Sequence, residues 1–202
     1  YWYTLFHQAS VSGAPVLRAL WVEYPTDTRT FTMDDQWLVG NALLVKPVMM
    51  EHATSVNVYL PAGTWVDLYT LKQMKSNGAE FKVDAPLDKI PVFLRSGTIV
   101  PRKMRLRRSS STMYSDPLTL FVTPDEKGFA EGQLYLDDEH TLNYESGQFA
   151  LRQLVFKDST LTCRAANGSG RFDAPNVLER VVIPGVKRAP RKVTLSNSQV
   201  NM

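Results

Sequence analysis

The chain has 202 residues, a net charge of +3, 44% hydrophobic residues and 21% charged residues, which is the composition of an ordinary globular protein with a packed core. No apolar run reaches about 18 residues, so the sequence predicts no membrane-spanning helix. The single cysteine, Cys163, excludes an internal disulfide and a cysteine-based metal cluster.

Residues 1–13 are predicted to form the end of a helix. The i, i+3, i+4, i+7 spacing of one apolar helix face is occupied by Trp2, Leu5, Phe6 and Ala9. Gly13 suits a helix C-terminus, with Pro15 just beyond it. Tyr1 lies inside this apolar segment, without an initiator methionine or the charged region of a signal peptide. We therefore expect the chain to begin inside an element of a larger protein, and Trp2, Leu5, Phe6 and Trp21 to face a preceding part.

The apolar pattern then changes to a period of two, which predicts β-strands. A first series of strands is expected within residues 42–45, 56–60, 65–69, 81–83, 90–94 and 99–100. A second series is expected within residues 118–122, 133–136, 141–144, 149–156, 161–164 and 180–183. Turn residues separate the strands at intervals of roughly 8–12 residues, the spacing typical of β-sandwiches.

Residues 101–115 form the best domain boundary, because hydrophobicity falls there and charge and serine content rise. The basic residues in this stretch are Arg102, Lys103, Arg105, Arg107 and Arg108, and a second cluster contains Lys187, Arg188, Arg191 and Lys192. Basic runs can bind nucleic acid, but no aromatic stacking residue interleaves with either cluster. We expect solvated or salt-bridged segments and no nucleic-acid partner.

Two acidic clusters could be proposed as catalytic carboxylates or as a metal site. Asp34 and Asp35 are adjacent, so on a strand they would point to opposite faces and could not cooperate. Asp137, Asp138 and Glu139 lie where a hairpin turn is expected, and they lack the Asp-x-Asp spacing with glycine of a calcium loop. We predict turn and capping roles for both clusters, with no catalytic residue, no metal ligand and no cofactor.

The remaining chemically capable side chains are isolated. His7, His52 and His140 form no metal-ligand pattern, and His7 is expected to be partly buried on the helix. Cys163 alternates within a strand and is expected to be a half-buried thiol. A sugar-stacking platform could be formed by Trp37, Trp65, Tyr59 and Tyr69, although core packing is the commoner use of such residues in strands.

Several strings resemble the C-terminal third of glycoside hydrolase family 31 α-glucosidases. They include YWYTLF at 1–6, LWVEYP at 20–25, DDQ at 34–36, ALLVKPV at 42–48, VYLP at 58–61 and APLDKIPVF at 85–93. The strings at 99–110, 116–122 and 134–138 are similar more narrowly to the branch that contains the catalytic α subunits of endoplasmic-reticulum glucosidase II. The resemblance covers roughly residues 1–185.

This resemblance implies a mainly β fold, with two β-sandwich domains following the last helix of a truncated (β/α)8 barrel. Residues 1–35 would end the catalytic barrel, 36–103 would form a proximal C-terminal β-sandwich and 104–202 a distal one. The family uses two aspartates in a retaining mechanism through a covalent intermediate. Their motifs do not occur in this chain, so no catalytic residue is carried over.

The resemblance also implies partners and a compartment. The chain would be the C-terminal, non-catalytic part of an α-glucosidase that removes terminal glucose during N-glycan trimming in the endoplasmic reticulum lumen. Its expected partners are the remainder of the catalytic barrel, a non-catalytic β subunit and the oligosaccharide substrate. The alternatives are a family relative with another substrate, or a free-standing carbohydrate-binding or scaffold module without hydrolase activity.

Two local features complete the expectations. Glu139 stands where the family carries a turn glycine, and such glycines often adopt positive φ. Asn167-Gly168-Ser169 is an N-glycosylation acceptor pattern in a polar stretch between strands, so Asn167 is a possible glycosylation site and is expected to be exposed.

Overall fold

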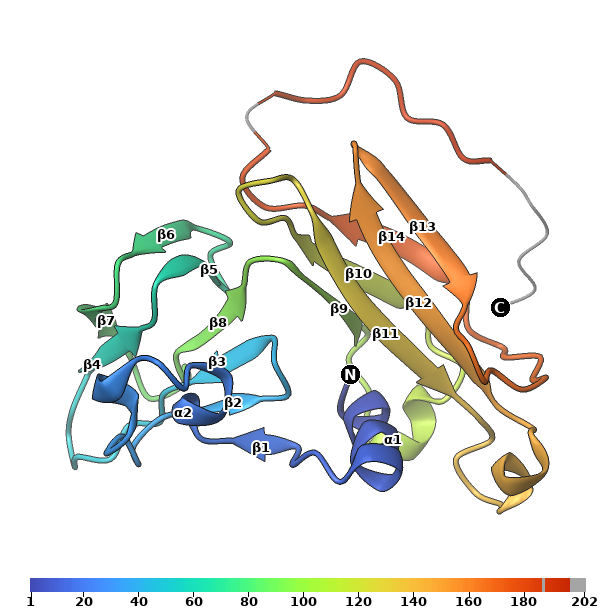
Figure 1. Cartoon of the computed structure of the whole chain (residues 1–202), viewed down its shortest axis with the longest axis horizontal. Coiled ribbons are helices and arrows are strands. Elements are labelled where there is room, and N and C mark those ends of the chain that lie inside the picture. The colour runs from blue at the N-terminus through green and yellow to red at the C-terminus, as the bar shows by residue number, and fades with distance from the viewer. Residues whose placement is uncertain (187, 197–202) are drawn as a thin grey trace.

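The chain is mainly β, and the computed structural model describes residues 1–186 and 188–196 (Figure 1). Its N-terminal segment forms helix α1, Trp2–Ser12, as the apolar spacing predicts. The helix ends at Gly13, whose φ of 73° is the left-handed conformation that glycine adopts without steric strain. The short elements that follow are not predicted from the sequence; they are β1 (Leu17–Arg18), α2 (Leu20–Glu23) and a 3-10 turn at Thr28–Thr30.

The first β unit pairs a six-stranded sheet with a separate two-stranded one. The six strands occur in the order β1, β2 (Trp37–Val39), β3 (Leu43–Val45), β8 (Val92–Arg95), β5 (Gly63–Asp67) and β6 (Gln73–Ser76). The second sheet pairs β4 (Ser55–Leu60) with β7 (Ala79–Asp84). Their shared core contains Leu20, Leu38, Leu44, Val58, Tyr59, Leu60, Trp65 and Phe93. Because β4 contributes to the core of the larger sheet, the two sheets pack as a small sandwich.

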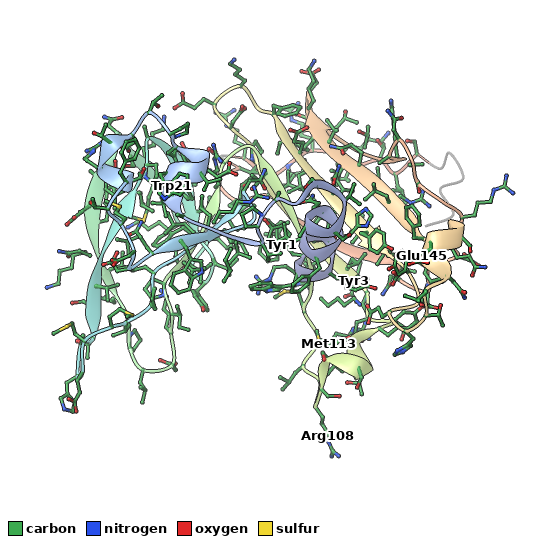
Figure 2. All side chains as sticks on the ribbon, turned by 60° about the horizontal axis from the view of Figure 1, so that its bottom comes forward. Tyr1, Tyr3, Trp21, Arg108, Met113 and Glu145 are labelled. Carbon is green, nitrogen blue, oxygen red and sulfur yellow. The ribbon has the colours of Figure 1, made fainter. Side chains whose placement is uncertain are left out.

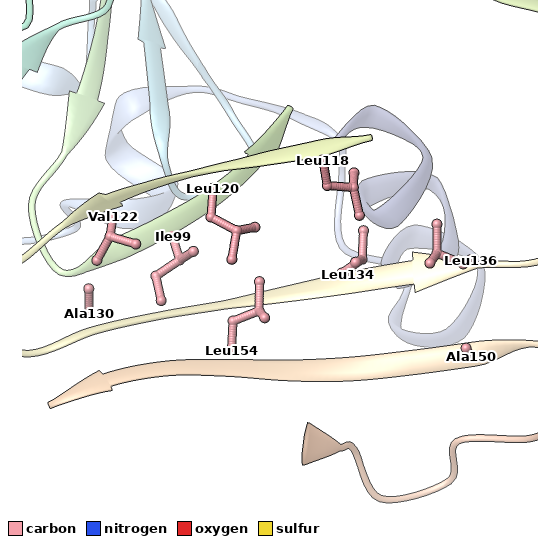
Figure 3. Close-up of a cluster of buried hydrophobic side chains, with 9 residues drawn as sticks. All are labelled: Ile99, Leu118, Leu120, Val122, Ala130, Leu134, Leu136, Ala150 and Leu154. Carbon is pink, nitrogen blue, oxygen red and sulfur yellow. The ribbon is translucent and has the colours of Figure 1, made fainter. Parts of the chain in front are cut away.

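The second β unit is one six-stranded sheet that bends around its own core. Its order is β13 (Thr160–Ala165), β12 (Ala150–Lys157), β11 (Ala130–Leu136), β9 (Thr98–Lys103), β10 (Leu118–Thr123) and β14 (Leu178–Val182). Figure 3 shows side chains of β9 and β10 pointing toward those of β11 and β12 across this core. The apolar residues of alternate strand positions thus meet inside the bend.

Gly132 permits the close approach of β11 to β9. A Cβ atom at this position would lie 2.2 Å from the backbone oxygen of Ile99, closer than van der Waals contact allows. The two strands share one parallel pairing, between Glu131 and Thr98. A side chain at residue 132 would therefore push apart the two halves of the sheet.

A third core cluster joins the two β units. Ala42, Val66 and Leu94 of the first unit pack with Val100 and Phe121 of the second. Helix α1 lies at the same junction (Figure 1) and contacts both units. The hydroxyl of Tyr1 donates to the carbonyl of Val39 in β2 at 3.0 Å, while α1 rests on β11.

One predicted strand is wrong. Residues 141–144 alternate in polarity, but a 3-10 turn forms at Asn143–Ser146, and Leu142 and Tyr144 are exposed. Asp138 accepts the amides of His140 and Thr141, which bends the chain away from β11, and Gly147 closes the turn with φ 82°. Strand β11 pairs with β12 instead.

The division into residues 1–35, 36–103 and 104–202 stays a prediction. The change from one large sheet to the other lies at Ser96 and Gly97, between β8 and β9, because β9 pairs with β10.

In the described part of the chain, no helix is long and apolar enough to cross a membrane. Lys187, of the second basic cluster, lies outside the described residues.

Candidate functional site

The contact between α1 and β11 centres on the carboxylate of Asp137. The hydroxyl of Tyr3 donates to Asp137 Oδ1 at 2.6 Å, and that of Tyr135 donates to Oδ2 at 2.9 Å. The amide of Glu139 donates to Oδ1 at 2.8 Å. Asp137 is 5% exposed, and burial together with the hydrogen bonds to Asp137 raises the pKa of both tyrosines. The carboxylate therefore fixes the helix to the strand.

Further side chains of α1 extend this contact along the strand. The imidazole of His7 stacks on the ring of Tyr135, with centroids 3.9 Å apart. Thr4 Oγ1 accepts the amide of Tyr135 at 3.0 Å, and Gln8 Nε2 donates to Gln133 Oε1 at 3.0 Å. Figure 2 shows Tyr3 on the helix and Tyr1 just before it, at the junction of the two β units. Helix α1 is therefore a bound part of the second unit's surface.

The stacked position of His7 predicts a stability change in the acidic range. Burial lowers the pKa of His7, which the neighbouring Asp137 carboxylate partly opposes. The unfolded chain then binds the proton more readily, so this contribution to stability is complete above the ordinary histidine pKa of about 6.5 and is lost as pH falls below it. Denaturant unfolding of wild type and His7→Phe between neutral pH and pH 5 should show a smaller pH-dependent loss in the variant. Parallel pH profiles would contradict this role of His7.

The second part of the acidic cluster is a turn. Asp138 Oδ1 accepts hydrogen bonds from the amides of His140, at 3.1 Å, and Thr141, at 2.9 Å. The hydrogen bond from the Thr141 hydroxyl is the main cause that lowers the pKa of Asp138, and these two amide hydrogen bonds lower it further. Glu139 adopts φ 58°, the positive value for which a glycine is the usual choice. The predicted turn and capping role is confirmed for Asp138, whereas Asp137 also accepts hydrogen bonds from Tyr3 and Tyr135.

The first acidic cluster consists of exposed or ion-paired side chains. Asp35 binds Lys46, whereas Asp34 is exposed on the adjacent position. The neighbouring Gln36 is buried. Its Oε1 accepts a hydrogen bond from the amide of Tyr59 at 3.0 Å, and its Nε2 donates to the carbonyl of Tyr59 at 2.7 Å. Among the described residues, no group of three or more His, Cys, Asp or Glu side chains is placed to hold a metal ion.

The basic run at 102–108 is salt-bridged, as predicted. Arg107 binds Asp116 through two nitrogens, at 2.6 and 3.1 Å, and Arg105 binds Glu179 at 3.0 Å. The guanidinium of Arg102 lies 4.8 Å from the centre of the Phe121 ring. Figure 2 shows Arg108 at the end of the projecting loop that also carries Met113.

The candidate sugar-stacking platform does not assemble. Trp65 is 1% exposed in the core, and its Nε1 donates to the carbonyl of Pro61 at 2.9 Å. Tyr59 is likewise buried, whereas Tyr69 is exposed beneath the Nζ of Lys89.

Cys163 is half-buried on β13, where burial raises its pKa, so it is a packed thiol.

Exposed aromatic side chains lie on α1 and, separately, on α2. Trp2 is 51% exposed and Phe6 58%, with their rings 6.4 Å apart, and Trp21 on α2 is 50% exposed. The expectation for Leu5 is wrong, because it is 3% exposed and lies against this chain's own core. Exposed aromatic pairs such as Trp2 and Phe6 are typical of interaction surfaces.

The exposed rings of α1 are expected to promote self-association of the isolated chain. Replacing Trp2 and Phe6 together (Trp2→Ser with Phe6→Ser) should shift the chain toward monomer in sizing chromatography, because it removes apolar area without touching the contacts of Tyr3 or His7. Leu87→Ser, at a fully exposed loop position, is the control and should change little. An unchanged elution profile of the double variant would argue against association through α1.

Asn167 lies in an exposed turn, as expected. It follows β13, and the turn is closed by the amide of Ser169 donating to the carbonyl of Ala166 at 3.0 Å. Its modification stays a prediction.

Comparison with known proteins identifies relatives of the chain. Residues 13–100 match the glycosyl hydrolase family 31 C-terminal domain. The chain is 48% identical over 199 residues to neutral alpha-glucosidase AB of Sus scrofa, a match that covers 96% of this chain and 21% of that protein. It is 43% identical, with the same two coverages, to neutral alpha-glucosidase AB of Dictyostelium discoideum.

Solved structures of glucosidase II are also similar to this chain. A Tris-bound glucosidase II alpha subunit matches with a TM-score of 0.86 and 33% identity, over 94% of this chain and 21% of that chain. An ER glucosidase II heterodimeric complex of the catalytic subunit and the binding domain of the regulatory subunit matches with a TM-score of 0.85 and 33% identity, over 90% and 21%. The chain thus spans about a fifth of the length of these proteins, 21% in each case.

Proposed function

Because this chain belongs to glycoside hydrolase family 31 and corresponds to its C-terminal region, we propose that it is the non-catalytic C-terminal part of a retaining α-glucosidase. In this proposal the chain closes one side of the catalytic barrel and supports it, while both catalytic aspartates lie in a preceding part of the protein. The substrate would carry terminal α-linked glucose.

The observation that carries this proposal is the N-terminal segment. Helix α1 is fixed to the second β unit through Asp137, and its opposite face presents Trp2 and Phe6 outward. Such a helix is bound on one side and apolar on the other, which suits an element shared between this chain and a further packed domain. The carboxylates of the two acidic clusters are engaged in turns, helix contacts and an ion pair, or are exposed singly.

The alternative of a free-standing carbohydrate-binding module has less support. A sugar-binding platform needs exposed aromatic rings in one plane, and Trp65 and Tyr59 are buried in the core. A scaffold module remains distinct from the proposal only if nothing is encoded before α1.

The relatives support a proposal for the compartment and the partners. We place the protein in the endoplasmic reticulum lumen, trimming N-linked glycans together with a non-catalytic β subunit. Support comes from the likeness to glucosidase II and to its complex with a regulatory subunit. The remainder of the barrel would cover the exposed face of α1 and α2.

The sequence of the transcript upstream of the Tyr1 codon tests the proposal. We expect an open reading frame that continues upstream into a barrel with two aspartate motifs of the family. A stop codon in frame, followed by a start codon next to Tyr1, would refute it.

A further inference from the structure

The turn after β13 presents one asparagine to solvent with open space around it. Asn167 is exposed, and the following Gly168 has φ 79°. A Cβ built on Gly168 would meet no atom within 4 Å, so the space beside Asn167 is open, whereas a Cβ on Gly170 would lie 1.9 Å from the backbone oxygen of Gly147. A bulky group on the Asn167 side chain can therefore be accommodated without moving the fold.

The same chain offers a contrasting Asn-Gly turn at Asn77. Gly78 there is enclosed, since a Cβ would lie 2.3 Å from a guanidinium nitrogen of Arg29 and 2.8 Å from the hydroxyl of Tyr59. Asn77 is followed two positions later by Ala79, whereas Asn167 is followed by Ser169. Of these two Asn-Gly turns, the one at Asn167 has open space beside the glycine and a serine two positions after the asparagine, as N-glycosylation requires.

We infer that Asn167 carries an N-linked glycan. In the transfer, Asn167 Nδ2 forms a bond to the first sugar of a lipid-linked oligosaccharide diphosphate. The bond between that sugar and the diphosphate breaks, the lipid diphosphate leaves and Nδ2 loses one proton. The inference rests on the proposed function in one respect, because it requires entry into the secretory pathway.

The fold also fixes when the transfer takes place. Ser169 Oγ accepts the amide of Leu151 at 3.0 Å, and the amide of Arg171 donates to the carbonyl of Gly147 at 2.8 Å. These bonds attach the acceptor turn to β12 and to the turn before it, and they engage the Ser169 hydroxyl. Transfer therefore precedes the docking of this turn, on a chain that is still folding.

The glycan would lie at the end of an edge strand. β13 is the outermost strand of its sheet and pairs only with β12 in that sheet. Free strand edges invite pairing with other chains, and natural proteins cover them. A hydrated oligosaccharide attached just beyond Ala165 shields this edge.

The test uses the whole protein, expressed in eukaryotic cells behind a cleavable secretory leader, so that it enters the lumen whether or not the proposed compartment is correct. Trypsin releases the peptide 165–171, which contains Asn167. Digestion with an N-glycosidase in heavy-oxygen water converts a glycosylated asparagine to a labelled aspartate. Omission of the enzyme reveals the spontaneous deamidation to which Asn-Gly pairs are prone.

We expect the labelled peptide from wild type and from Ser169→Thr, which keeps the hydroxyl. Asn167→Gln should reduce the mass shift of the protein on glycosidase treatment by the mass of one glycan. Recovery of peptide 165–171 entirely unmodified from the lumenal protein would overturn the inference. Hydrolysis of an α-glucoside by the same preparation is measured separately, so an active but unmodified protein would refute the glycan alone.

Discussion

Asp137→Ala is expected to lower the free energy of unfolding of this chain by about 2–4 kcal/mol, because it leaves buried donors without an acceptor. The carboxylate accepts from the hydroxyls of Tyr3 and Tyr135 and from the amide of Glu139. Tyr135 is 4% exposed, so its hydroxyl cannot turn to water without moving the strand. Loss of the Tyr3 bond also weakens the attachment of α1 to β11, which His7, Thr4 and Gln8 would still hold.

Denaturant unfolding followed by far-ultraviolet circular dichroism measures this effect. Asp138→Ala is the matched control, because the neighbouring carboxylate is only partly buried and caps only the turn. Its expected loss is clearly smaller. Equal losses for the two variants would mean that Asp137 acts as an ordinary turn residue and that α1 is held by other contacts.

Trp65→Ala is expected to lower the free energy of unfolding by about 3–5 kcal/mol, more than Asp137→Ala, because it opens a cavity in the core of the first β unit. Trp65 is 1% exposed and packs among strands of both sheets of the sandwich, and its indole nitrogen donates to Pro61. Trp65→Phe retains most of the volume but loses the hydrogen bond, so an intermediate loss is expected.

Tyr69→Ala provides the surface control for Trp65, since Tyr69 is 54% exposed and its main contact is with Lys89. We expect little change in stability there. A small effect of Trp65→Ala, comparable with that of Tyr69→Ala, would contradict the core assignment and revive the stacking platform.

The sequence predicted the elements whose physical signal is local. Helix α1 follows from the spacing of Trp2, Phe6 and Ala9 and from Gly13, and strands form within the predicted alternating segments except at residues 141–144. The turn at Asp138 and Glu139 was predicted from its position between strands. Cys163 was predicted to be half-buried from alternation alone, and it is.

The parts that the sequence did not predict depend on distant contacts. Residues 141–144 alternate like a strand, but no strand in the described part of the chain pairs with them, so exposed Leu142 and Tyr144 carry no burial energy that would hold them extended. The contact of Tyr3 with Asp137 joins residues 134 positions apart, and no local pattern reveals it. The sequence offers one hint of this contact: Tyr3 is a tyrosine, with a polar hydroxyl, next to the apolar residues of the predicted helix.

The burial of Leu5 illustrates the same limit. Helical spacing assigns Leu5 to one face together with Trp2 and Phe6, yet Leu5 lies against this chain while the other two rings are exposed. Which side of an amphipathic helix meets which domain is decided by tertiary packing.

Hydrolysis of a chromogenic α-glucoside by the purified 202-residue chain, measured beside the whole protein, tests the central claim most directly. The chain alone is expected to give no turnover above a buffer blank, and the whole protein is expected to hydrolyse the substrate, because both catalytic aspartates are assigned to the preceding part. Turnover that co-purifies with the chain through successive columns, and that is removed by depletion with an antibody against it, would contradict this account.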